Sequence, residues 1–338
     1  MTARTGLYMP AEWSRHRRTF TAFPDQSSQK DAEILHGAER DVASIANAIS
    51  AFEPVTLLCR PKNVAQAAKL VSPSVHIQEM EVDELWLRDT GPVYVKNAEG
   101  QLLGVDFNFN YWGAKYEGTI DQSVARSLLG HDATERMQAQ VVTEGGAIEV
   151  DGDGTLIMTE SSVINDNRNP GASKEQLEEK FKTLLGVQKI IWLKGLKGYD
   201  ITDAHIDATA RFIAPGRIIL NRPAKSASQV FIDAWEEDKR ILAEEKDAKG
   251  RSLEVIELEE ADPTKFDGDD YEKCLSYLNY LLVNGGLIMP AFGDEVADER
   301  AFALLQQLFP DRKVVQVRLN ALRKLGGGIH CATQQQPE

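Results

Sequence analysis

The chain has 338 residues, of which 42% are hydrophobic and 27% are charged, a balance that is typical of globular proteins and excludes a disordered chain. Lys and Arg total 38 against 52 for Asp and Glu, so the net charge is −14, which argues against a nucleic-acid partner and weakly favours a small cationic ligand. The sequence shows neither a signal peptide nor an apolar run long enough to span a membrane, so we expect a cytoplasmic protein with no membrane partner.

The first part of the chain predicts a unit of alternating strands and helices. A short strand at residues 19–23 leads into a long helix at 30–52, where apolar residues recur at helical spacing. The unit continues with a strand at 55–59, a helix at 62–70 and a strand at 75–80. We expect the glycine-rich segment near the end of the chain to pair with the first strand and to supply its missing hairpin partner.

Four further units each predict a hairpin, a helix and a strand. The second unit has strands at 93–95 and 102–109, a helix at 120–129 and a strand at 140–142. The corresponding elements of the third unit are at 147–150, 155–159, 174–185 and 189–193. Those of the fourth are at 208–213, 218–221, 226–245 and 253–258, and those of the fifth at 277–283, 287–290, 296–308 and 314–319. Such a unit, repeated about every 50–70 residues, indicates radial or stacked repetition. We therefore predict a single α/β domain over residues 1–338, with its modules around an axis.

Two acidic segments lie between these elements. Residues 262–270 include Pro263 and Gly268 and predict a surface loop. The segment Asp151-Gly152-Asp153-Gly154 superficially suggests calcium, but it lacks the ligand spacing of an EF-hand and predicts a hairpin turn.

Chemically reactive side chains occur at matching places in the predicted modules, beside or within the hairpins. The segments concerned are Trp86-Leu87-Arg88-Asp89, Glu144-Gly145-Gly146, His205-Ile206-Asp207, Asn284-Gly285-Gly286 and His330-Cys331. If the modules surround an axis, these positions converge on it. One site would then collect several carboxylates, a histidine and a cysteine.

This set of residue types fits nucleophilic chemistry at a guanidinium group. A cysteine becomes reactive as a thiolate, and a nearby imidazolium or bound cation favours that form. A histidine held by a carboxylate transfers protons, and two further carboxylates bind a planar guanidinium through paired hydrogen bonds. We therefore predict attack of the Cys331 thiolate on the guanidinium carbon, loss of ammonia and hydrolysis of a covalent thiouronium intermediate. The alternative is an inert thiol after the glycine-rich run Gly326-Gly327-Gly328.

In this order the motifs resemble those of the agmatine deiminases, which are grouped with bacterial-type peptidylarginine deiminases in the guanidine-modifying superfamily. The resemblance runs nearly end to end. Besides the segments above it includes Met9-Pro10-Ala11-Glu12-Trp13, Thr90-Gly91-Pro92, Asn167-Arg168-Asn169-Pro170 and Gly327-Gly328-Ile329. It implies a five-bladed α/β propeller (pentein) of ββαβ modules that uses no metal or cofactor. The implied reaction converts agmatine, a small cationic guanidine, into N-carbamoylputrescine and ammonia on the route to putrescine in polyamine biosynthesis.

The resemblance also implies a role for each site residue. Cys331 is the implied nucleophile, His205 the general acid and base, and Glu144 the support of the histidine or the guanidinium. The implied substrate-binding residues are Asp89 and Asp207, which hold the guanidinium, Trp86, which lines the pocket, and Asn284, a lesser candidate for positioning. Arg88 is expected to be a structural partner.

Two positions depart from the family pattern. Ala204 stands before the histidine where the family has glycine, and Phe23-Pro24 replaces Trp-Pro near the N-terminus. A methyl group at position 204 alters the backbone freedom next to the histidine. It leaves open a deiminase of free or peptidyl arginine, or a weakly active member that binds a guanidine without processing it.

Other interpretations of the reactive residues are less favoured. His330 adjoins Cys331, but neighbours on a strand point to opposite faces, so His205 is the better base. A zinc site formed by His205, Asp207 and Cys331 is disfavoured because the sequence has no paired ligand motif there. A papain-like hydrolase is disfavoured because the seven residues after Cys331 cannot form the helix that supports such a nucleophile. Cys59 is expected in a strand and Cys274 in a helix-like segment, and both are predicted to be inert thiols. A disulfide framework is not expected. The sequence leaves open whether the protein forms a homo-oligomer.

Overall fold

The computed structural model describes residues 6–27, 29–266 and 274–338. The chain forms two compact units, each assembled from segments that are distant in sequence. Unit 1 contains residues 1–14, 89–220 and 229–257, and unit 2 contains residues 15–88, 221–228 and 258–338. Part of the predicted acidic loop at 262–270, including Gly268, lies outside the described residues.

Unit 1 is built mainly from three of the predicted modules. Its strands are β4 (Val93–Lys96), β5 (Leu102–Asp106), β6 (Glu135–Gln138), β7 (Glu149–Val150), β8 (Thr155–Thr159), β9 (Lys189–Leu193), β10 (Ala210–Ala214), β11 (Arg217–Arg222) and β12 (Glu254–Glu259), of which the last two end in unit 2. Its helices are α4 (Tyr111–Ala114), α5 (Val124–His131), α6 (Glu160–Val163), α7 (Lys174–Leu185) and α8 (Gln229–Glu244). Short 3-10 helices occupy Asp121–Ser123, Gly145–Ala147 and Ile206–Ala208.

Unit 2 contains the first and last modules. Its strands are β1 (His16–Ala22), β2 (Val55–Cys59), β3 (Val75–Glu79), β13 (Leu281–Val283), β14 (Gly286–Ala291), β15 (Lys313–Arg318) and β16 (Thr333–Pro337). Its helices are α1 (Ala32–Ile49), α2 (Val64–Leu70) and α9 (Glu295–Leu308), with 3-10 helices at Pro61–Asn63, Pro263–Lys265 and Leu322–Leu325. The short helix α3 (Leu87–Thr90) carries the chain from unit 2 into unit 1.

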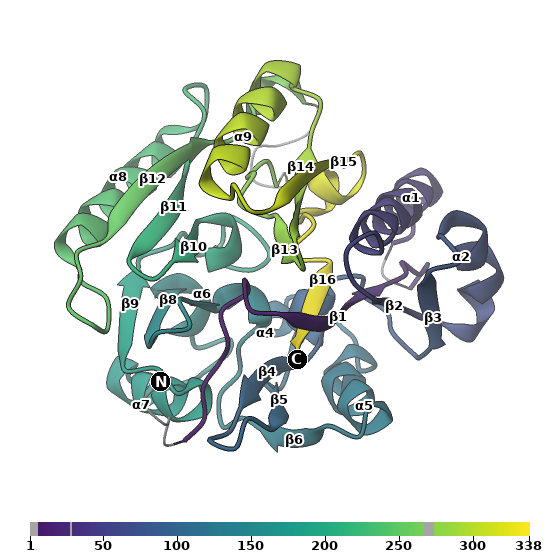
Figure 1. Cartoon of the computed structure of the whole chain (residues 1–338), viewed down its shortest axis with the longest axis horizontal. Coiled ribbons are helices and arrows are strands. Elements are labelled where there is room, and N and C mark those ends of the chain that lie inside the picture. Colours follow the sequence, from purple (N-terminus) through teal and green to yellow (C-terminus); the bar gives the residue numbers. More distant parts are fainter. Residues whose placement is uncertain (1–5, 28, 267–273) are drawn as a thin grey trace. The chain divides into compact units, whose positions relative to one another are not determined.

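The strands form five small sheets within the described residues, in the orders β16-β1-β2-β3, β4-β5-β6, β7-β8-β9, β10-β11-β12 and β13-β14-β15. In four of them an antiparallel pair is followed by a parallel strand, as in β4, β5 and β6. Strand β16 pairs with β1, which confirms that the end of the chain completes the first module. Figure 1 shows α8 beside β11 and β12, and α9 beside β14 and β15.

The core of unit 1 lies on both faces of the β7-β8-β9 sheet. Leu156 and Ile190 belong to one buried cluster together with α7, whereas the next residues, Ile157 and Ile191, belong to another with Leu242 of α8. Successive side chains of a strand point to opposite faces. A sheet covered on both sides therefore has the continuous apolar strands that the sequence shows here.

Helix α7 shows how local sequence fixes an element. The Ser173 side chain accepts a hydrogen bond from the Gln176 backbone N–H, and the Gln176 side chain accepts one from the Ser173 backbone N–H, which forms a capping box. Gly186 ends the helix with φ of 66°, and a Cβ there would lie 1.6 Å from the carbonyl oxygen of Leu7. The helix predicted at 174–185 and the strands predicted at 55–59, 155–159 and 189–193 have the observed bounds.

Three sequence predictions were wrong. The module has no strand at 140–142, and its last strand is β6 at Glu135–Gln138. The carbonyl groups of Ala139 and Val141 accept hydrogen bonds from the Asn108 side chain instead. Strand β6 was missed because it lies at a sheet edge and is only partly buried, so it lacks an apolar run. His330 and Cys331 lie in a turn before β16, and Cys274 lies outside any helix. His330 and Cys331 are therefore not neighbours on a strand, and opposite strand faces do not separate their side chains.

Two smaller features complete the fold. The predicted turn at residues 151–154 is confirmed, because Oδ1 of Asp151 accepts hydrogen bonds from the backbone of Asp153 and Thr155, each at 2.8 Å. In the part of the chain that the structure describes, no helix is both long and apolar enough to cross a bilayer.

Candidate active site

Unit 1 brings together one histidine and three carboxylates in a buried cluster. Nε2 of His205 lies 3.2 Å from Oε2 of Glu144, and Nδ1 lies 3.7 Å from Oδ1 of Asp89. The three atoms that would lie nearest to a Cβ at Gly146 all belong to this cluster. A Cβ at Gly146 would lie 2.5 Å from His205 Nδ1, 3.0 Å from Asp89 Oδ1 and 3.2 Å from Asp207 Oδ2. The absence of a side chain at this position therefore lets Asp89, His205 and Asp207 approach one another.

The cluster is positioned by equivalent short turns in successive modules. Glu144 precedes the 3-10 helix Gly145–Ala147, and His205 precedes the 3-10 helix Ile206–Ala208, which contains Asp207. Both turns lead directly into the first strand of a hairpin. The sequence prediction that matching module positions converge therefore holds for these residues within unit 1.

Asp89 receives two hydrogen bonds that fix its carboxylate. The backbone N–H of Gly146 donates to Oδ1 at 3.1 Å, and Nε1 of Trp112 donates to Oδ2 at 2.9 Å. Trp112 was not predicted as a site residue. It lies in a segment where Tyr111, Trp112 and Ala114 all have positive φ, between 53° and 59°. Non-glycine residues rarely adopt this conformation, so residue type could not indicate it.

The cluster contains strongly shifted ionisable groups. Burial of His205 would lower its pKa, but Asp89, Glu144 and Asp207 outweigh this effect and raise that pKa to about 9. Burial raises the pKa of Asp89 to about 6, despite the opposing effect of His205. Burial also acts to raise the pKa of Glu144, but hydrogen bonds from His205 and the charge of Arg168 hold it below its ordinary value. At neutral pH the histidine is therefore an imidazolium beside carboxylates.

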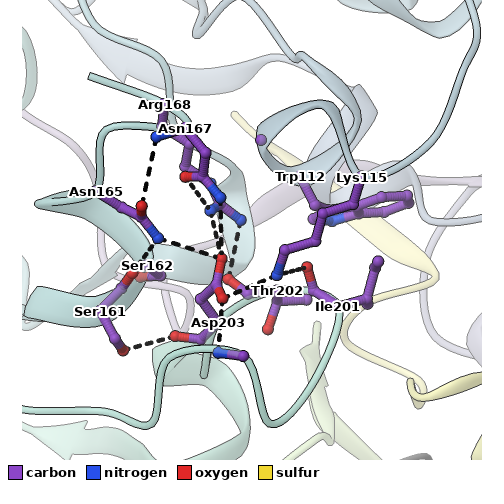
Figure 2. Close-up of polar contacts among 12 residues, drawn as sticks. Trp112, Lys115, Ser161, Ser162, Asn165, Asn167, Arg168, Ile201, Thr202 and Asp203 are labelled. Atoms are coloured by element: carbon purple, nitrogen blue, oxygen red, sulfur yellow. Dashed lines mark hydrogen bonds and ion pairs between the residues drawn. The ribbon is translucent and has the colours of Figure 1, made fainter. Parts of the chain in front are cut away.

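Arg168 is a further cluster residue whose role was not predicted from the sequence. It is buried, and its Nε donates to both carboxylate oxygens of Glu144 at 2.8 and 3.0 Å. Its Nη1 donates to Oδ2 of Asp203 at 2.9 Å. Figure 2 shows Arg168 and its neighbours converging on Asp203. Arg168 belongs to the motif Asn167-Arg168-Asn169-Pro170, and this motif is the sequence feature that could have indicated its role.

Unit 2 carries Cys331 in a turn beside a buried asparagine. Nδ2 of Asn279 lies 3.2 Å from the Cys331 Sγ, and Oδ1 of Asn279 accepts the backbone N–H of Cys331 at 3.2 Å. The Asn279 carbonyl also accepts the backbone N–H of His330 at 3.1 Å. Cys331 is partly exposed, whereas Asn279 is fully buried. Sequence reasoning missed Asn279, which lies 52 residues from the cysteine and in no motif.

The glycines before Cys331 permit close contacts within unit 2. A Cβ at Gly327 would lie 2.3 Å from the ring of Trp86, and one at Gly328 would lie 2.6 Å from Oδ1 of Asn279. Arg88 supports the same turn, because its Nε donates to the His330 carbonyl at 3.2 Å and its backbone N–H to the Cys331 carbonyl at 3.1 Å. Trp86 therefore packs against the cysteine segment, and Arg88 is the structural partner that we predicted.

Asn284 occupies a different place in unit 2, at the turn between β13 and β14. Its Nδ2 donates to the His16 carbonyl at 2.8 Å, and its Oδ1 accepts the His16 backbone N–H at 3.0 Å. Its own backbone N–H donates to Glu53 at 2.8 Å. These contacts favour a structural role for Asn284 that joins the turn to the start of β1. Asn279, not Asn284, supplies the amide beside the thiol.

The comparisons with known proteins agree over nearly the whole chain. The model of the Porphyromonas-type peptidyl-arginine deiminase family matches residues 8–337. The putative agmatine deiminase of Legionella pneumophila subsp. pneumophila (strain Philadelphia 1) is 38% identical over 336 residues, which cover 98% of this chain and 95% of the relative. The agmatine deiminase of Stutzerimonas stutzeri (strain A1501) is 38% identical over 361 residues, with coverage of 98% and 96%.

The chain is also similar to solved structures. The structure of the agmatine deiminase of Enterococcus faecalis matches with a TM-score of 0.88 and 29% identity, and the match covers 100% of this chain and 99% of that one. Together with the five small sheets, this likeness confirms the predicted fold, the pseudo-symmetric α/β propeller (pentein) built of five ββαβ modules.

Proposed function

Because the chain belongs to the Porphyromonas-type peptidyl-arginine deiminase family, we propose that it hydrolyses agmatine to N-carbamoylputrescine and ammonia. The observation that carries this proposal is the buried cluster of unit 1, where Asp89, Glu144 and Asp207 surround the His205 imidazole. Carboxylates that are already fixed by hydrogen bonds bind a planar guanidinium cation without reorganisation.

The reaction proceeds in two halves. The Cys331 thiolate attacks the central guanidinium carbon, and a C–S bond forms. His205, as an imidazolium, gives its proton to one nitrogen of the resulting tetrahedral adduct. That C–N bond breaks, ammonia leaves, and a covalent thiouronium remains on the cysteine. His205 then takes a proton from water, and the hydroxide attacks the same carbon. The C–S bond breaks to release the thiolate, and the hydroxyl proton of the adduct passes to solvent, which leaves the neutral carbamoyl product.

Each site residue has a defined task in this scheme. Asp89 and Asp207 hold the guanidinium nitrogens, and Glu144 keeps His205 oriented and protonated. Trp86 lines the pocket, and the Asn279 amide donates to the Cys331 sulfur and so favours its thiolate. Arg168 neutralises Glu144, which would otherwise be a buried carboxylate with only one cationic partner.

The substrate is tested by measuring ammonia release from agmatine, free arginine and an arginyl peptide at equal concentrations. The curated relatives are named agmatine deiminases, whereas the matching family model is named for peptidyl-arginine. We expect agmatine to be turned over fastest. If agmatine reacts no faster than either arginine substrate, the proposed specificity is refuted. Calorimetric binding of agmatine without product on long incubation would identify an inactive guanidine-binding member instead.

The nucleophile is tested with Cys331→Ala, and Cys274→Ala serves as the control because it removes a different thiol of unit 2. We expect Cys331→Ala to lower kcat by more than about 10⁴-fold, because residues of a covalent mechanism act as one unit. Mass spectrometry of the wild-type enzyme quenched during turnover should detect the covalent adduct. A Cys331→Ala protein with full activity would refute the thiolate mechanism.

We further propose that residues 1–338 act as one catalytic domain in the cytoplasm. The three cysteines form no disulfide with one another in the structure, as is typical of proteins in a reducing compartment. Light scattering would determine whether the active species is a monomer or a homo-oligomer.

A further inference from the structure

The segment just before His205 has a backbone conformation that its residues do not favour. Asp203 and Ala204 have φ of 63° and 68°, in the left-handed region where the Cβ atom of an L-residue approaches the carbonyl oxygen. Glycine would adopt this conformation freely, but neither residue is glycine. The surroundings of residues 202–205 must therefore hold the turn in place.

Backbone groups of this turn are held by side chains from unit 1. The Ala204 backbone N–H donates to Asp200 at 3.0 Å, and the Ala204 carbonyl accepts from Thr159 Oγ1 at 2.7 Å. The Asp203 carbonyl accepts from Ser161 Oγ at 2.6 Å. The backbone N–H of His205 donates to Thr202 Oγ1 at 3.1 Å, and the Thr202 carbonyl accepts from Nη2 of Arg168 at 2.9 Å. The orientation of His205 is thus tied to the geometry of the whole turn.

The Asp203 carboxylate is the centre of this arrangement (Figure 2). Its Oδ1 accepts from Lys115 Nζ at 2.8 Å and from the Gly198 backbone at 2.9 Å, and its Oδ2 accepts from Arg168 at 2.9 Å. Longer contacts of 3.4 Å come from the side-chain amides of Asn165 and Asn167. Burial would raise the pKa of Asp203, but hydrogen bonds from Lys115 and Arg168 outweigh it and hold that pKa below its ordinary value. The carboxylate is therefore charged and held by two cations.

Lys115 connects this turn to the segment that fixes Asp89. Its Nζ also donates to the Ile201 carbonyl at 2.9 Å and to the Asp200 carbonyl at 3.3 Å. Lys115 directly follows the left-handed residues of α4, where Trp112 donates to Asp89. A single lysine side chain therefore joins two segments with unfavourable backbone conformations. One contains Trp112, which fixes the substrate-binding residue Asp89, and the other carries His205.

We propose that Lys115 and Asp203 form a latch that positions His205 for proton transfer, an inference that rests on the proposed function. Arg168 alone cannot replace the latch, because it also neutralises Glu144, the hydrogen-bond partner of His205. Without Lys115, Asp203 depends on Arg168, which it already shares with Glu144, and the turn before His205 loses three hydrogen bonds. Lys115 and Asp203 are positioning residues, since they act through His205.

The kinetic test compares Lys115→Met, which keeps length without charge, with Lys115→Arg, which keeps the cation. Lys197→Met is the matched control, because Lys197 is exposed and lies in the same loop as Gly198. We expect Lys115→Met to lower kcat about 10–100-fold, because small misplacement of a catalytic group has effects of this size. The KM for agmatine should change less than about threefold. Lys115→Arg should recover most of kcat, and Lys197→Met should match the wild type.

An unchanged kcat in Lys115→Met would overturn the latch. So would an equal loss in Lys197→Met or a failure of Lys115→Arg to recover activity, because either would point to general loosening of the loop. Thermal unfolding of each variant verifies that the protein is folded.

A second measurement needs no turnover. The ring nitrogens of His205 are followed by NMR in protein labelled with ¹⁵N-histidine, with His205→Asn used for assignment. We expect the imidazolium signals of the wild type to shift in Lys115→Met, as the ring moves relative to Glu144. Identical signals in both proteins would overturn the latch. If the wild type fails to hydrolyse agmatine, the proposed function fails, and the NMR result still decides whether Lys115 positions His205.

Discussion

The segment that carries His205 in unit 1 and the segment that carries Cys331 in unit 2 both present a reactive side chain on irregular backbone, but they are held differently. Before His205, Asp203 and Ala204 adopt left-handed conformations under the control of charged contacts from Lys115 and Arg168. Before Cys331 lie three successive glycines. Gly326 has a positive φ, and Gly327 and Gly328 lie too close to neighbouring groups for a side chain to fit.

The difference determines how each segment is expected to fail. Glycine adopts a left-handed conformation without steric strain and leaves room for a close neighbour. The cysteine turn therefore depends mainly on the space around its backbone. The histidine turn depends on charged groups, of which Arg168 and Asp203 are buried, and removing one partner of a buried pair is usually strongly destabilising. We therefore expect the cysteine segment to be sensitive to added atoms and the histidine segment to changes in ionisation.

The largest effect on the cysteine side is expected for Gly327→Ala. The added Cβ would lie 2.3 Å from the Trp86 ring, and a ring in a packed site cannot move aside without displacing its neighbours. We expect kcat for agmatine to fall about 100-fold and the free energy of unfolding to fall by about 1–3 kcal/mol. Steady-state kinetics and urea unfolding measure the two effects.

Gly130→Ala in α5 is the matched control for this substitution. A Cβ at Gly130 would meet no atom within 4 Å, so stability should rise by up to about 1 kcal/mol, as expected for alanine in a helix. Wild-type activity in Gly327→Ala would contradict the idea that the cysteine turn depends on shape.

The pH dependence of kcat/KM tests the charged side of the comparison. Asp89 must be ionised to hold a cation, and its pKa is raised to about 6, so kcat/KM should fall as the pH drops through this value. His205 must be protonated to release ammonia, and its pKa is raised to about 9, so kcat/KM should fall again as the pH rises through that value. Beyond each limit the loss should approach about tenfold per pH unit.

A variant identifies the group behind the upper limit. Glu144→Gln removes a carboxylate that helps to raise the pKa of His205, so the upper limit should move to lower pH. An upper limit that stays in place would mean that another group controls it.

The sequence allowed most of the fold and the reactive residues to be predicted, but not the contacts that hold them. Cys331, His205, Glu144 and Asp89 lie in short motifs beside hairpins, and the module pattern follows from apolar periodicity. Asn279 could not be found, because its contact with the thiol joins positions 52 residues apart and depends on the turn geometry.

The latch could not be predicted for a related reason. The contacts of Lys115 with residues 200–203 depend on positive φ at non-glycine positions such as Trp112 and Ala204. Residue type gives no indication of such conformations, because they are imposed by tertiary contacts that local propensity opposes. The same applies to Asn284, whose motif suggested the site while its side chain binds the backbone of His16.

The smallest expected effect is that of Ala204→Gly, which separates backbone strain from positioning. Removing the Cβ at φ of 68° relieves about 1–2 kcal/mol of left-handed strain, while the freer unfolded chain opposes this by about 0.4–1 kcal/mol. The free energy of unfolding should therefore rise by no more than about 1.5 kcal/mol. Activity should stay within about threefold of the wild type, because the contacts that hold this turn are made by its backbone and by Asp203, not by the Ala204 methyl group. A tenfold gain in kcat would show that the alanine itself restrains catalysis, and a loss of stability would show that the surroundings do not impose the left-handed turn. Thermal unfolding and agmatine turnover, measured on the same samples, distinguish these outcomes.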